Sequence, residues 1–526
     1  MQNAAIIGLA IVDIILVALS QIALWQRKEY RADRMREYID SPEGSLKQHP
    51  WPLIAGLLVG MGWMLVLREN EVAAEYAGLA SLLLILVGHT VRIRIKGVMR
   101  PTLTFRAGIV SLVVCIACIA WGIYLVIPHI LVALQMATLA FFLPVIIAGV
   151  VFLVTIPATL QKKWVISQAK KLRNSFDTLT VVGITGSVGK TSTKTYLLHI
   201  LGGASKTVQA TSEHRNSPYV VALDMLSKLT SKTSTYIAEM GAYKKGEIAE
   251  LCQLAQPKIG VLTAITNQHA ALFGSLENLA TAKWELIDAL PTDGIAVLNA
   301  DDKNVVKKAK GLKKKVVWYS LKEKNPILTH ASVIGNGQLS SVFAAVTVAR
   351  TLGVSDDVIA KRLATLPVLS QTMELKKGKN SSTVIDDSYS ASEASVMNAI
   401  EYLRELSVGD NRLVMVPIIE LGSEGPAVHK RIGKALSPLP IQVYIYGDAY
   451  REDIQKGLGV SPAAIVVWMN DPKVTAQQIA KDMATETVVV LEGRLPNIIR
   501  QAVIPDLIGD PSKEVDSRLR GNDKRL

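Results

Sequence analysis

The sequence has few cysteines and begins without the features of a cleaved export signal. Cys115, Cys118 and Cys252 are its only cysteines among 526 residues, so neither a disulfide framework nor a zinc site is expected. The first apolar run, Ala4–Trp25, has no positive charge before it, is interrupted by Asp13 and has no small-residue cleavage site after it. This pattern favours a retained membrane anchor over a signal peptide.

Charged residues are nearly absent from five long runs in the first third of the chain. These runs are Ala4–Trp25, Pro52–Leu67, Ala73–Val91, Ala107–Ile127 and Ile130–Ile156. A helix needs about 20 apolar residues to cross a bilayer, so the sequence predicts a transmembrane region over residues 1–160 with five spans. Pro52–Leu67 is the shortest span, and Pro144 predicts a tilted or kinked last helix.

Lysine and arginine are concentrated in alternate loops of this region. They are frequent after the first, third and fifth spans and nearly missing from Arg68–Glu71 and Pro128–His129. The positive-inside rule then predicts an outside N-terminus and places everything after Thr159 in the cytoplasm. The net charge of +13 is interpreted as contact with membrane lipids and not with nucleic acid. A generally basic surface is the alternative for Lys307–Lys315.

A glycine-rich turn follows the apolar run Leu179–Val182. Residues 183–193 read Gly-Ile-Thr-Gly-Ser-Val-Gly-Lys-Thr-Ser-Thr, which is typical of a strand that leads into a phosphate-binding loop and a helix. The residues predicted to bind ATP here are Gly186, Ser187, Gly189, Lys190, Thr191 and Ser192. Lys190 is expected to reach the phosphates, and the Thr191 hydroxyl to bind Mg²⁺. Ile184 stands where the strict pattern has a glycine, so a turn without a ligand is the alternative.

Strand-like and helix-like patterns alternate from Thr178 onward. The strand-like runs are Leu179–Ile184, Thr235–Glu239, Ile259–Ala264, Ile295–Asn299 and Val316–Tyr319, then, after a break near Leu366, Ser382–Ile385, Arg412–Val416, Gln442–Tyr446, Ile465–Trp468 and Thr487–Leu491. This spacing predicts parallel sheets with crossover helices. The predicted fold class is an α-helical membrane region followed by two α/β domains, at residues 175–367 and 368–502, with a disordered tail at 503–526.

Several short motifs in this half of the chain occur in the order known from one enzyme family. They are Thr185-Gly-Ser-Val-Gly-Lys-Thr-Ser, Glu239-Met-Gly, His269 with Phe273-Gly-Ser-Leu-Glu, Ala282-Lys283, Leu298-Asn-Ala-Asp-Asp and Ile385-Asp-Asp-Ser-Tyr. Together they resemble the ATP-dependent Mur ligases, nearest the branch that adds D-alanyl-D-alanine to the peptidoglycan precursor. The resemblance implies a P-loop central domain, a Rossmann-like C-terminal domain and a bacterial inner-membrane location for this chain. It also implies a ligase that uses ATP to activate a carboxylate as an acyl phosphate, which an amine then attacks.

The same resemblance implies roles for individual residues. The implied catalytic residues are Lys190, His269 and Lys283; the implied Mg²⁺ ligands are Thr191, Glu239, His269 and a carbamylated Lys283; the implied nucleotide contacts include Asn299, Asp386 and Asp387. Asn216 falls in the substrate loop of the family. Each assignment has a structural alternative: a surface histidine at 269, a solvated lysine at 283 and a helix cap at the two aspartates.

The departures from the family pattern concern the acceptor side of the reaction. Thr372 stands where the family has an arginine, and Glu492 where it has a lysine. The family's N-terminal domain, which grips a UDP-sugar, is replaced by the predicted spans. We therefore expect a membrane-anchored ligase of cell-envelope synthesis that joins a lipid-linked murein-type peptide to an amino acid or dipeptide. The alternatives are a nucleotide-binding sensor or scaffold of a cell-wall complex and another amide ligase of the superfamily, such as a polyglutamate-type ligase.

Overall fold

The structure is a computed structural model that divides into two compact units. The boundary between the two units falls within one long helix. It describes residues 2–28, 30, 35–36, 51–96, 101–102, 104–126, 131–203, 207–212, 216–266, 273–323, 325–406, 409–418, 421, 424–481 and 483–505. One unit contains the chain up to Lys162, and the other begins at Lys163. His269 and all but the first three residues of the predicted tail at 503–526 lie outside the described residues. The predicted four-part division of the chain stays a prediction.

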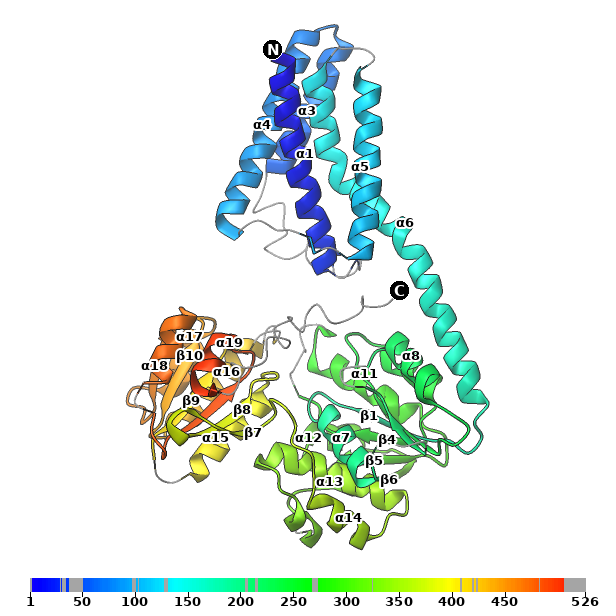
Figure 1. Ribbon diagram of the computed structural model, residues 1–526, viewed down its shortest axis with the longest axis vertical. Helices are drawn as coiled ribbons and strands as arrows, with labels where there is room; N and C mark the ends of the chain where they lie inside the picture. The colour runs from blue at the N-terminus through cyan, green and yellow to red at the C-terminus, as the bar shows by residue number, and fades with distance from the viewer. Residues whose placement is uncertain are drawn as a thin grey trace. The chain divides into compact units, whose positions relative to one another are not determined.

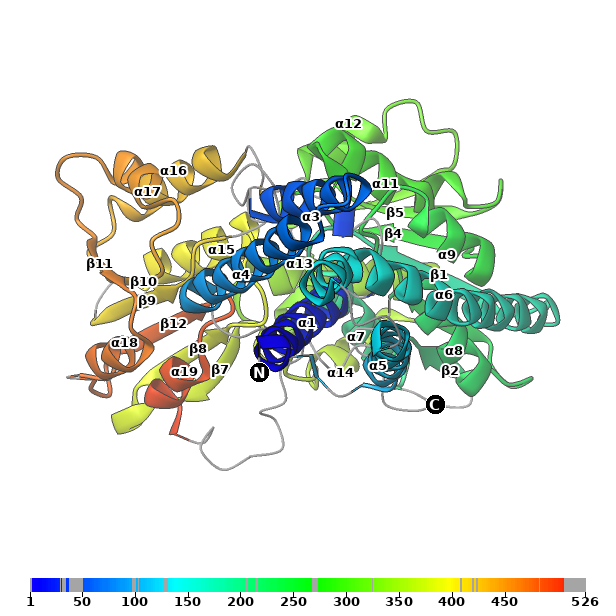
Figure 2. The same ribbon diagram turned by 90° about the horizontal axis from the view of Figure 1, so that it is seen from above.

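The first unit is a bundle of apolar helices (Figures 1 and 2). Its described helices are α1 (Gln2–Arg27), α3 (Trp51–Leu67), α4 (Glu71–Lys96), α5 (Phe105–Val126) and α6 (Val132–Asn174). Among the described residues, three segments are long and apolar enough to cross a membrane, namely Ile6–Arg27, Glu71–Gly88 and Val132–Asn174. Ile54–Leu67 and Arg106–Cys118 are shorter apolar helices. Long apolar helices are thus confirmed for three of the predicted spans, while the five-span topology stays a prediction.

Close backbone approach joins α4 to α6. A Cβ added at Gly78 would lie 2.3 Å from the backbone nitrogen of Leu134, so a larger residue would force the two helices apart. Glu75 accepts hydrogen bonds from the N–H groups of Ala133 at 2.8 Å and Leu134 at 3.4 Å. These N–H groups belong to the first turn of α6 and have no partner within the helix. Glu75 therefore caps α6 from the neighbouring helix.

Helix α6 continues through 43 residues, past Pro144 and Pro157, to its end at Asn174. Val165 and Ala169, near that end, are buried in the core of the first α/β domain. Arg173 donates to the carbonyl groups of Phe176, Leu179 and Ala255 at 2.9 to 3.2 Å. The apolar bundle is therefore joined to the α/β part of the chain by continuous helix.

The first sheet is entirely parallel and has the order β2-β3-β1-β4-β5-β6. Its strands are β1 (Thr180–Thr185), β2 (Val208–Ala210), β3 (Thr235–Glu239), β4 (Ile259–Leu262), β5 (Ile295–Asn299) and β6 (Lys315–Tyr319). Successive side chains of a strand point to opposite faces, so Val181 and Val182 are both fully buried but in different cores. This arrangement requires helices on both faces of the sheet.

Helices cover each face of this sheet, as Figure 1 shows for α8 and α11 on one side and α13 and α14 on the other. The elements around the sheet are α7 (Lys190–Ile200), α8 (Pro218–Lys228), α9 (Glu247–Ala255), α11 (Leu276–Asp288), α12 (Lys303–Lys308), η1 (Pro326–His330), α13 (Gly335–Thr351) and α14 (Asp356–Leu363). The predicted strands of this domain are present. The short edge strand β2 was not predicted.

The second sheet has the order β11-β10-β9-β12-β8-β7, with only β7 antiparallel to its neighbour. Its elements are β7 (Glu374–Lys377), η2 (Lys379–Ser381), β8 (Thr383–Asp387), α15 (Glu393–Glu405), β9 (Asn411–Met415), α16 (Gly425–Leu436), β10 (Gln442–Tyr446), α17 (Arg451–Leu458), β11 (Ile465–Met469), α18 (Pro472–Ile479), β12 (Val488–Glu492) and α19 (Asn497–Val503). Figure 2 shows α15, α16 and α17 on one face and α18 and α19 on the other. The predicted fold class, apolar helices followed by two α/β domains, is confirmed.

Candidate nucleotide and metal site

Two glycines shape the turn between β1 and α7. Gly186 has a φ of 150° and Gly189 a φ of 80°, and residues other than glycine rarely adopt such values. A Cβ added at Gly186 would lie 2.0 Å from Oγ1 of Thr263. Gly189 is the N-cap of α7 and makes no side-chain hydrogen bond to the first turn. The N–H groups of that turn are therefore available to an anion.

Residues that follow β4, the strand next to β1, hold this turn in place by hydrogen bonds. The Thr263 hydroxyl donates to the carbonyl of Val188 at 2.6 Å, and the N–H of Ser187 donates to the carbonyl of Ala264 at 2.8 Å. The Ser187 hydroxyl accepts from the N–H of Thr266 at 3.1 Å. The loop is thus preformed by hydrogen bonds that do not use Lys190.

Lys190 folds back into the loop that precedes it. Its Nζ donates to the carbonyl groups of Gly186 at 2.8 Å and Ser187 at 3.1 Å. Burial lowers the pKa of Lys190, and the nearby Glu239 carboxylate opposes that shift. The ammonium group therefore lies inside the glycine-rich loop, where phosphate oxygens can replace these two carbonyl oxygens as its partners.

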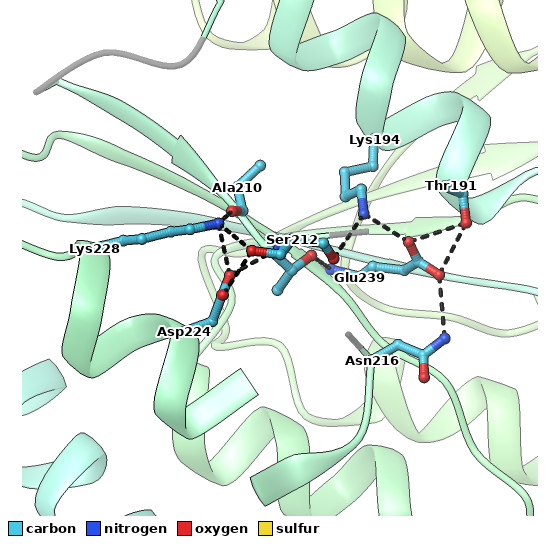
Figure 3. A network of polar contacts seen from close by, with 9 residues as sticks. Thr191, Lys194, Ala210, Ser212, Asn216, Asp224, Lys228 and Glu239 are labelled. Carbon is cyan, nitrogen blue, oxygen red and sulfur yellow. Dashed lines mark hydrogen bonds and ion pairs between the residues drawn. The ribbon is translucent and has the colours of Figure 1, made fainter. Parts of the chain in front are cut away.

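Glu239, the last residue of β3, is the centre of the polar network in Figure 3. The Thr191 hydroxyl lies 3.1 Å from each of its carboxylate oxygens. Lys194 Nζ lies 3.0 Å from Oε2, and Asn216 Nδ2 donates to Oε1 at 3.2 Å. Burial alone would raise the pKa of Glu239, but the charges of Lys194 and Lys190 hold the pKa below its ordinary value. The carboxylate is therefore ionised at neutral pH.

This geometry brings together most of the predicted phosphate and metal residues. Thr191 and Glu239, both predicted Mg²⁺ ligands, are in direct contact, with Lys190 on the same helix. Lys194 was not predicted as a site residue. It follows Thr191 by three residues and so lies on the same face of the helix, which could have indicated its place in the site. His269, predicted as catalytic and metal-binding, lies outside the described residues.

Lys283 is a buried lysine of α11, with 5% of its surface exposed. Its Nζ lies 6.0 Å from the centre of the Phe273 ring. Burial first and the charge of Lys190 second lower its pKa to about 7, although Glu247 and Glu285 act in the opposite direction. The alternative of a solvated helix lysine is therefore wrong, and an appreciable fraction of the amine is neutral at pH 7.

Asn299 shapes the chain at the end of β5. Its Nδ2 donates to the carbonyl of Thr263 at 2.9 Å, and its Oδ1 accepts from the N–H of Asp301 at 2.9 Å. It thus holds the strand end beside the same Thr263 that fastens the glycine-rich turn. The predicted contact of Asn299 with the nucleotide stays a prediction.

Asp386 and Asp387 have different partners at the end of β8. Asp386 is fully buried and forms an ion pair with Arg500 at 2.8 Å. Asp387 faces Glu492 across the β8–β12 register and accepts from the N–H of Met373 at 3.2 Å. Burial raises the pKa of Asp387 to about 6 and that of Glu492 well above its usual range. The two acids therefore retain protons at a pH where exposed carboxyls have lost theirs.

Neither aspartate caps a helix, because the N-cap of the following helix, α15, is Ser392. The helix-cap alternative for Asp386 and Asp387 is therefore wrong. Their predicted contact with the nucleotide stays a prediction.

The Thr191–Glu239 pair fits a magnesium ion. No group of three or more His, Cys, Asp or Glu side chains gathers as a metal site within the described part of the chain. Mg²⁺ prefers hard oxygen ligands and is commonly bound by one or two protein oxygens together with waters and substrate phosphates. A hydroxyl and a carboxylate beside a phosphate-binding turn meet that requirement.

Residues 184–354 match the family model described as the Mur ligase middle domain. This stretch is a Mur ligase middle domain, and the chain is a homologue of the Mur ligases. It is 28% identical over 358 residues to the UDP-N-acetylmuramoyl-tripeptide–D-alanyl-D-alanine ligase of Bacillus subtilis strain 168, covering 63% of this chain and 76% of that relative. It is 33% identical over 289 residues to the ligase of the same name from Mycobacterium tuberculosis strain H37Rv. That match covers 49% of this chain and 56% of the relative, so the chain spans little more than half of the mycobacterial protein.

Solved structures show the same fold. The MurF ligase of Thermotoga maritima in complex with ADP aligns with a TM-score of 0.56 and 24% identity, covering 65% of this chain and 84% of the chain of that structure. MurF from Acinetobacter baumannii aligns with a TM-score of 0.57 and 21% identity, covering 66% and 81%. The predicted resemblance to the Mur ligases is confirmed, and the chain is a homologue of ATP-dependent amide ligases. The family model begins after the apolar helices end.

Proposed function

We propose that this protein uses ATP and Mg²⁺ to join a carboxylate to an amine through an acyl phosphate. The observation that carries the proposal is the contact between Thr191 and Glu239 beside a loop that already encloses Lys190. The loop N–H groups and the Lys190 ammonium would hold the β- and γ-phosphates. Thr191 and Glu239 would hold Mg²⁺, which neutralises charge on the transferred phosphoryl group.

Lys283 is the proposed second functional lysine. The family resemblance implies that it is carbamylated, which would convert its amine into an oxygen ligand for metal. Its pKa of about 7 supports this role, because only the neutral amine reacts with carbon dioxide. His269 is proposed as its companion on the strength of the motif alone.

The proposed carboxylate substrate is a lipid-linked murein-type peptide, and the proposed amine is an amino acid or a dipeptide such as D-alanyl-D-alanine. Two observations support this choice. Apolar helices stand before the matched region, and α6 continues from them into the first α/β domain. The named relatives are UDP-N-acetylmuramoyl-tripeptide–D-alanyl-D-alanine ligases, which supports the dipeptide as the amine. The proposed location is the bacterial inner membrane, with membrane lipids as partners, the N-terminus outside and both α/β domains in the cytoplasm.

A non-catalytic nucleotide sensor is the second candidate. It is favoured by the loss of two cations: Thr372 replaces an arginine near the start of the C-terminal domain, and Glu492, the last residue of β12, replaces a lysine of the family pattern. Glu492 faces Asp387 and thereby forms an acid pair where the family pattern would place opposite charges.

ADP formation by the full-length protein in lipid nanodiscs tests these proposals. A set of lipid-linked and UDP-linked peptides would be paired with D-alanyl-D-alanine and with single amino acids. The ligase proposal expects ADP only when an acid and an amine are both present, with lipid-linked acids preferred. Turnover of UDP-linked peptide alone would contradict the lipid-linked substrate, and nucleotide binding without turnover of any pair would support the sensor. Calorimetric absence of Mg–ATP binding would contradict both.

A further inference from the structure

Lys194 and Thr191 lie three residues apart on α7, so their side chains leave the same face of the helix. Both meet the carboxylate of Glu239: Nζ of Lys194 is 3.0 Å from Oε2, and Oγ1 of Thr191 is 3.1 Å from each oxygen. The side chains of Lys194 and Glu239 are only 4% and 2% exposed. Salt therefore screens their charges weakly.

Lys194 is also held on the side away from Glu239. Its Nζ lies 3.4 Å from the carbonyl oxygen of Ser212. Asp224 accepts hydrogen bonds from both the N–H and the hydroxyl of Ser212 at 2.8 Å, and Lys228 donates to the same hydroxyl at 2.8 Å. Figure 3 shows this series of contacts. The ammonium of Lys194 is therefore held in one position, between Glu239 and Ser212.

The charges around Glu239 leave the site positive in the absence of a nucleotide. Lys190 and Lys194 are the cations that act on the single carboxylate of Glu239. A positive site attracts a polyphosphate and repels a free divalent cation. Lys194 in addition neutralises the carboxylate that the proposed metal site requires.

We infer that Lys194 is the resident counter-ion of Glu239 and restricts this site to a metal ion that arrives with its nucleotide. The inference rests on the proposed function, because it takes Thr191 and Glu239 as the metal ligands. Without the ammonium, Glu239 keeps the neutral donors Thr191 and Asn216. The site then carries an uncompensated carboxylate that a free divalent cation can occupy.

Binding of Mn²⁺, a paramagnetic substitute for Mg²⁺, to the full-length protein without nucleotide tests the inference by electron paramagnetic resonance. The variants Lys194→Met and Lys194→Gln are expected to bind free Mn²⁺ at least about tenfold more tightly than wild type, because one repulsive charge is lost. Lys228→Met removes a positive charge from the neighbouring contacts and is the matched control, expected to bind like wild type. The double variant Lys194→Met/Glu239→Gln is expected to lose the gained affinity.

Unchanged affinity for Mn²⁺ in folded Lys194→Gln protein would overturn the inference. Wild-type protein that binds free Mn²⁺ as tightly as it binds Mn²⁺ with ADP would overturn it as well, and that measurement needs no variant to fold. Wild-type protein that binds no Mg–ADP would instead overturn the proposed function. The two failures are therefore distinguishable.

Discussion

At the scale of single residues, Lys190 provides the most direct test of the nucleotide site. Lys190→Ala removes the ammonium that donates to the Gly186 and Ser187 carbonyls and that would face the phosphates. ADP formation is expected to fall by roughly a hundredfold or more, since a preorganised charge at the transferred group is lost. Membrane insertion should be unaffected. The exposed Lys232→Ala is a control that keeps wild-type rates, and preserved turnover in Lys190→Ala would mean that the nucleotide binds elsewhere.

The acid pair Asp387–Glu492 predicts an unusual pH dependence of stability. The pKa of each carboxyl is higher in the folded state than in the unfolded chain, so the folded state binds more protons between about pH 4 and 6. The contribution of the pair to the free energy of unfolding is therefore greatest in acid and declines as the pH rises through 6. Glu492→Gln removes one of the interacting charges. The variant should melt a few degrees higher than wild type at pH 8 and close to it at pH 5.

Thermal melting of both proteins over this pH range measures the effect. Asp357→Asn, which removes an exposed carboxyl from the first turn of α14, should show no comparable gain at pH 8. A difference between wild type and Glu492→Gln that is the same at every pH would contradict the raised pKa values of the acid pair.

The residues of the site differ in how far the sequence could predict them. Lys190, Thr191 and Glu239 lie within motifs whose geometry is local, a strand followed by a turn and a helix. The contact of Lys194 with Ser212 depends on where a separate loop lies. The ion pair between Asp386 and Arg500 joins residues more than a hundred positions apart, so spacing in the sequence gives no indication of it.

At the scale of elements, the strands with continuous apolar or β-branched runs were predicted, and the two that lack such runs were not. β2 has three residues, and β7 alternates exposed and half-buried side chains at the edge of its sheet. Central strands of a parallel sheet are buried on both faces and therefore need nearly continuous apolar residues, whereas edge strands do not. The phosphate-binding turn was predictable because glycine is required where φ is positive.

The crossing of α4 and α6 provides a prediction at this scale. Gly78→Leu places a side chain where even a Cβ would lie 2.3 Å from the Leu134 backbone, so the helices must separate and the Glu75 contacts with the first turn of α6 lengthen. We expect a loss of roughly 1–3 kcal/mol of stability, measured by thermal unfolding in detergent. Gly60→Leu on α3 is the matched control, because a Cβ there meets nothing within 4 Å. Equal melting temperatures for the two variants would contradict the close approach.

At the scale of the whole molecule, the chain has two parts, the apolar helices and the α/β domains that resemble Mur ligases. One helix, α6, continues from the first part into the second. Pro144 and Pro157 each remove a backbone donor from α6 without ending it. The contacts of Arg173 with three carbonyl groups then fix the end of the helix to the first α/β domain. The residues on either side of the boundary at Lys162 therefore belong to one helix and do not form a linker rich in glycine and serine.

The number of spans decides on which side of the membrane each loop lies. With five spans, the turn at Glu69 is outside and the basic segment at Arg100 is inside. If only the three longer segments cross, these two positions exchange sides, while the N-terminus and the α/β domains stay where they were. The positive-inside rule favours five spans, because Arg92, Arg94, Lys96 and Arg100 would otherwise face outward.

Labelling of single introduced cysteines with a membrane-impermeant maleimide on intact cells distinguishes the two topologies. We expect Glu69→Cys to be labelled before lysis and Arg100→Cys only after it. The wild-type chain, with Cys115 and Cys118 in an apolar helix and Cys252 buried, gives the background. Labelling of Arg100→Cys on intact cells would show that only three helices span the membrane. A loop with that much positive charge reaches the outside only when α3 and α5 do not cross the membrane.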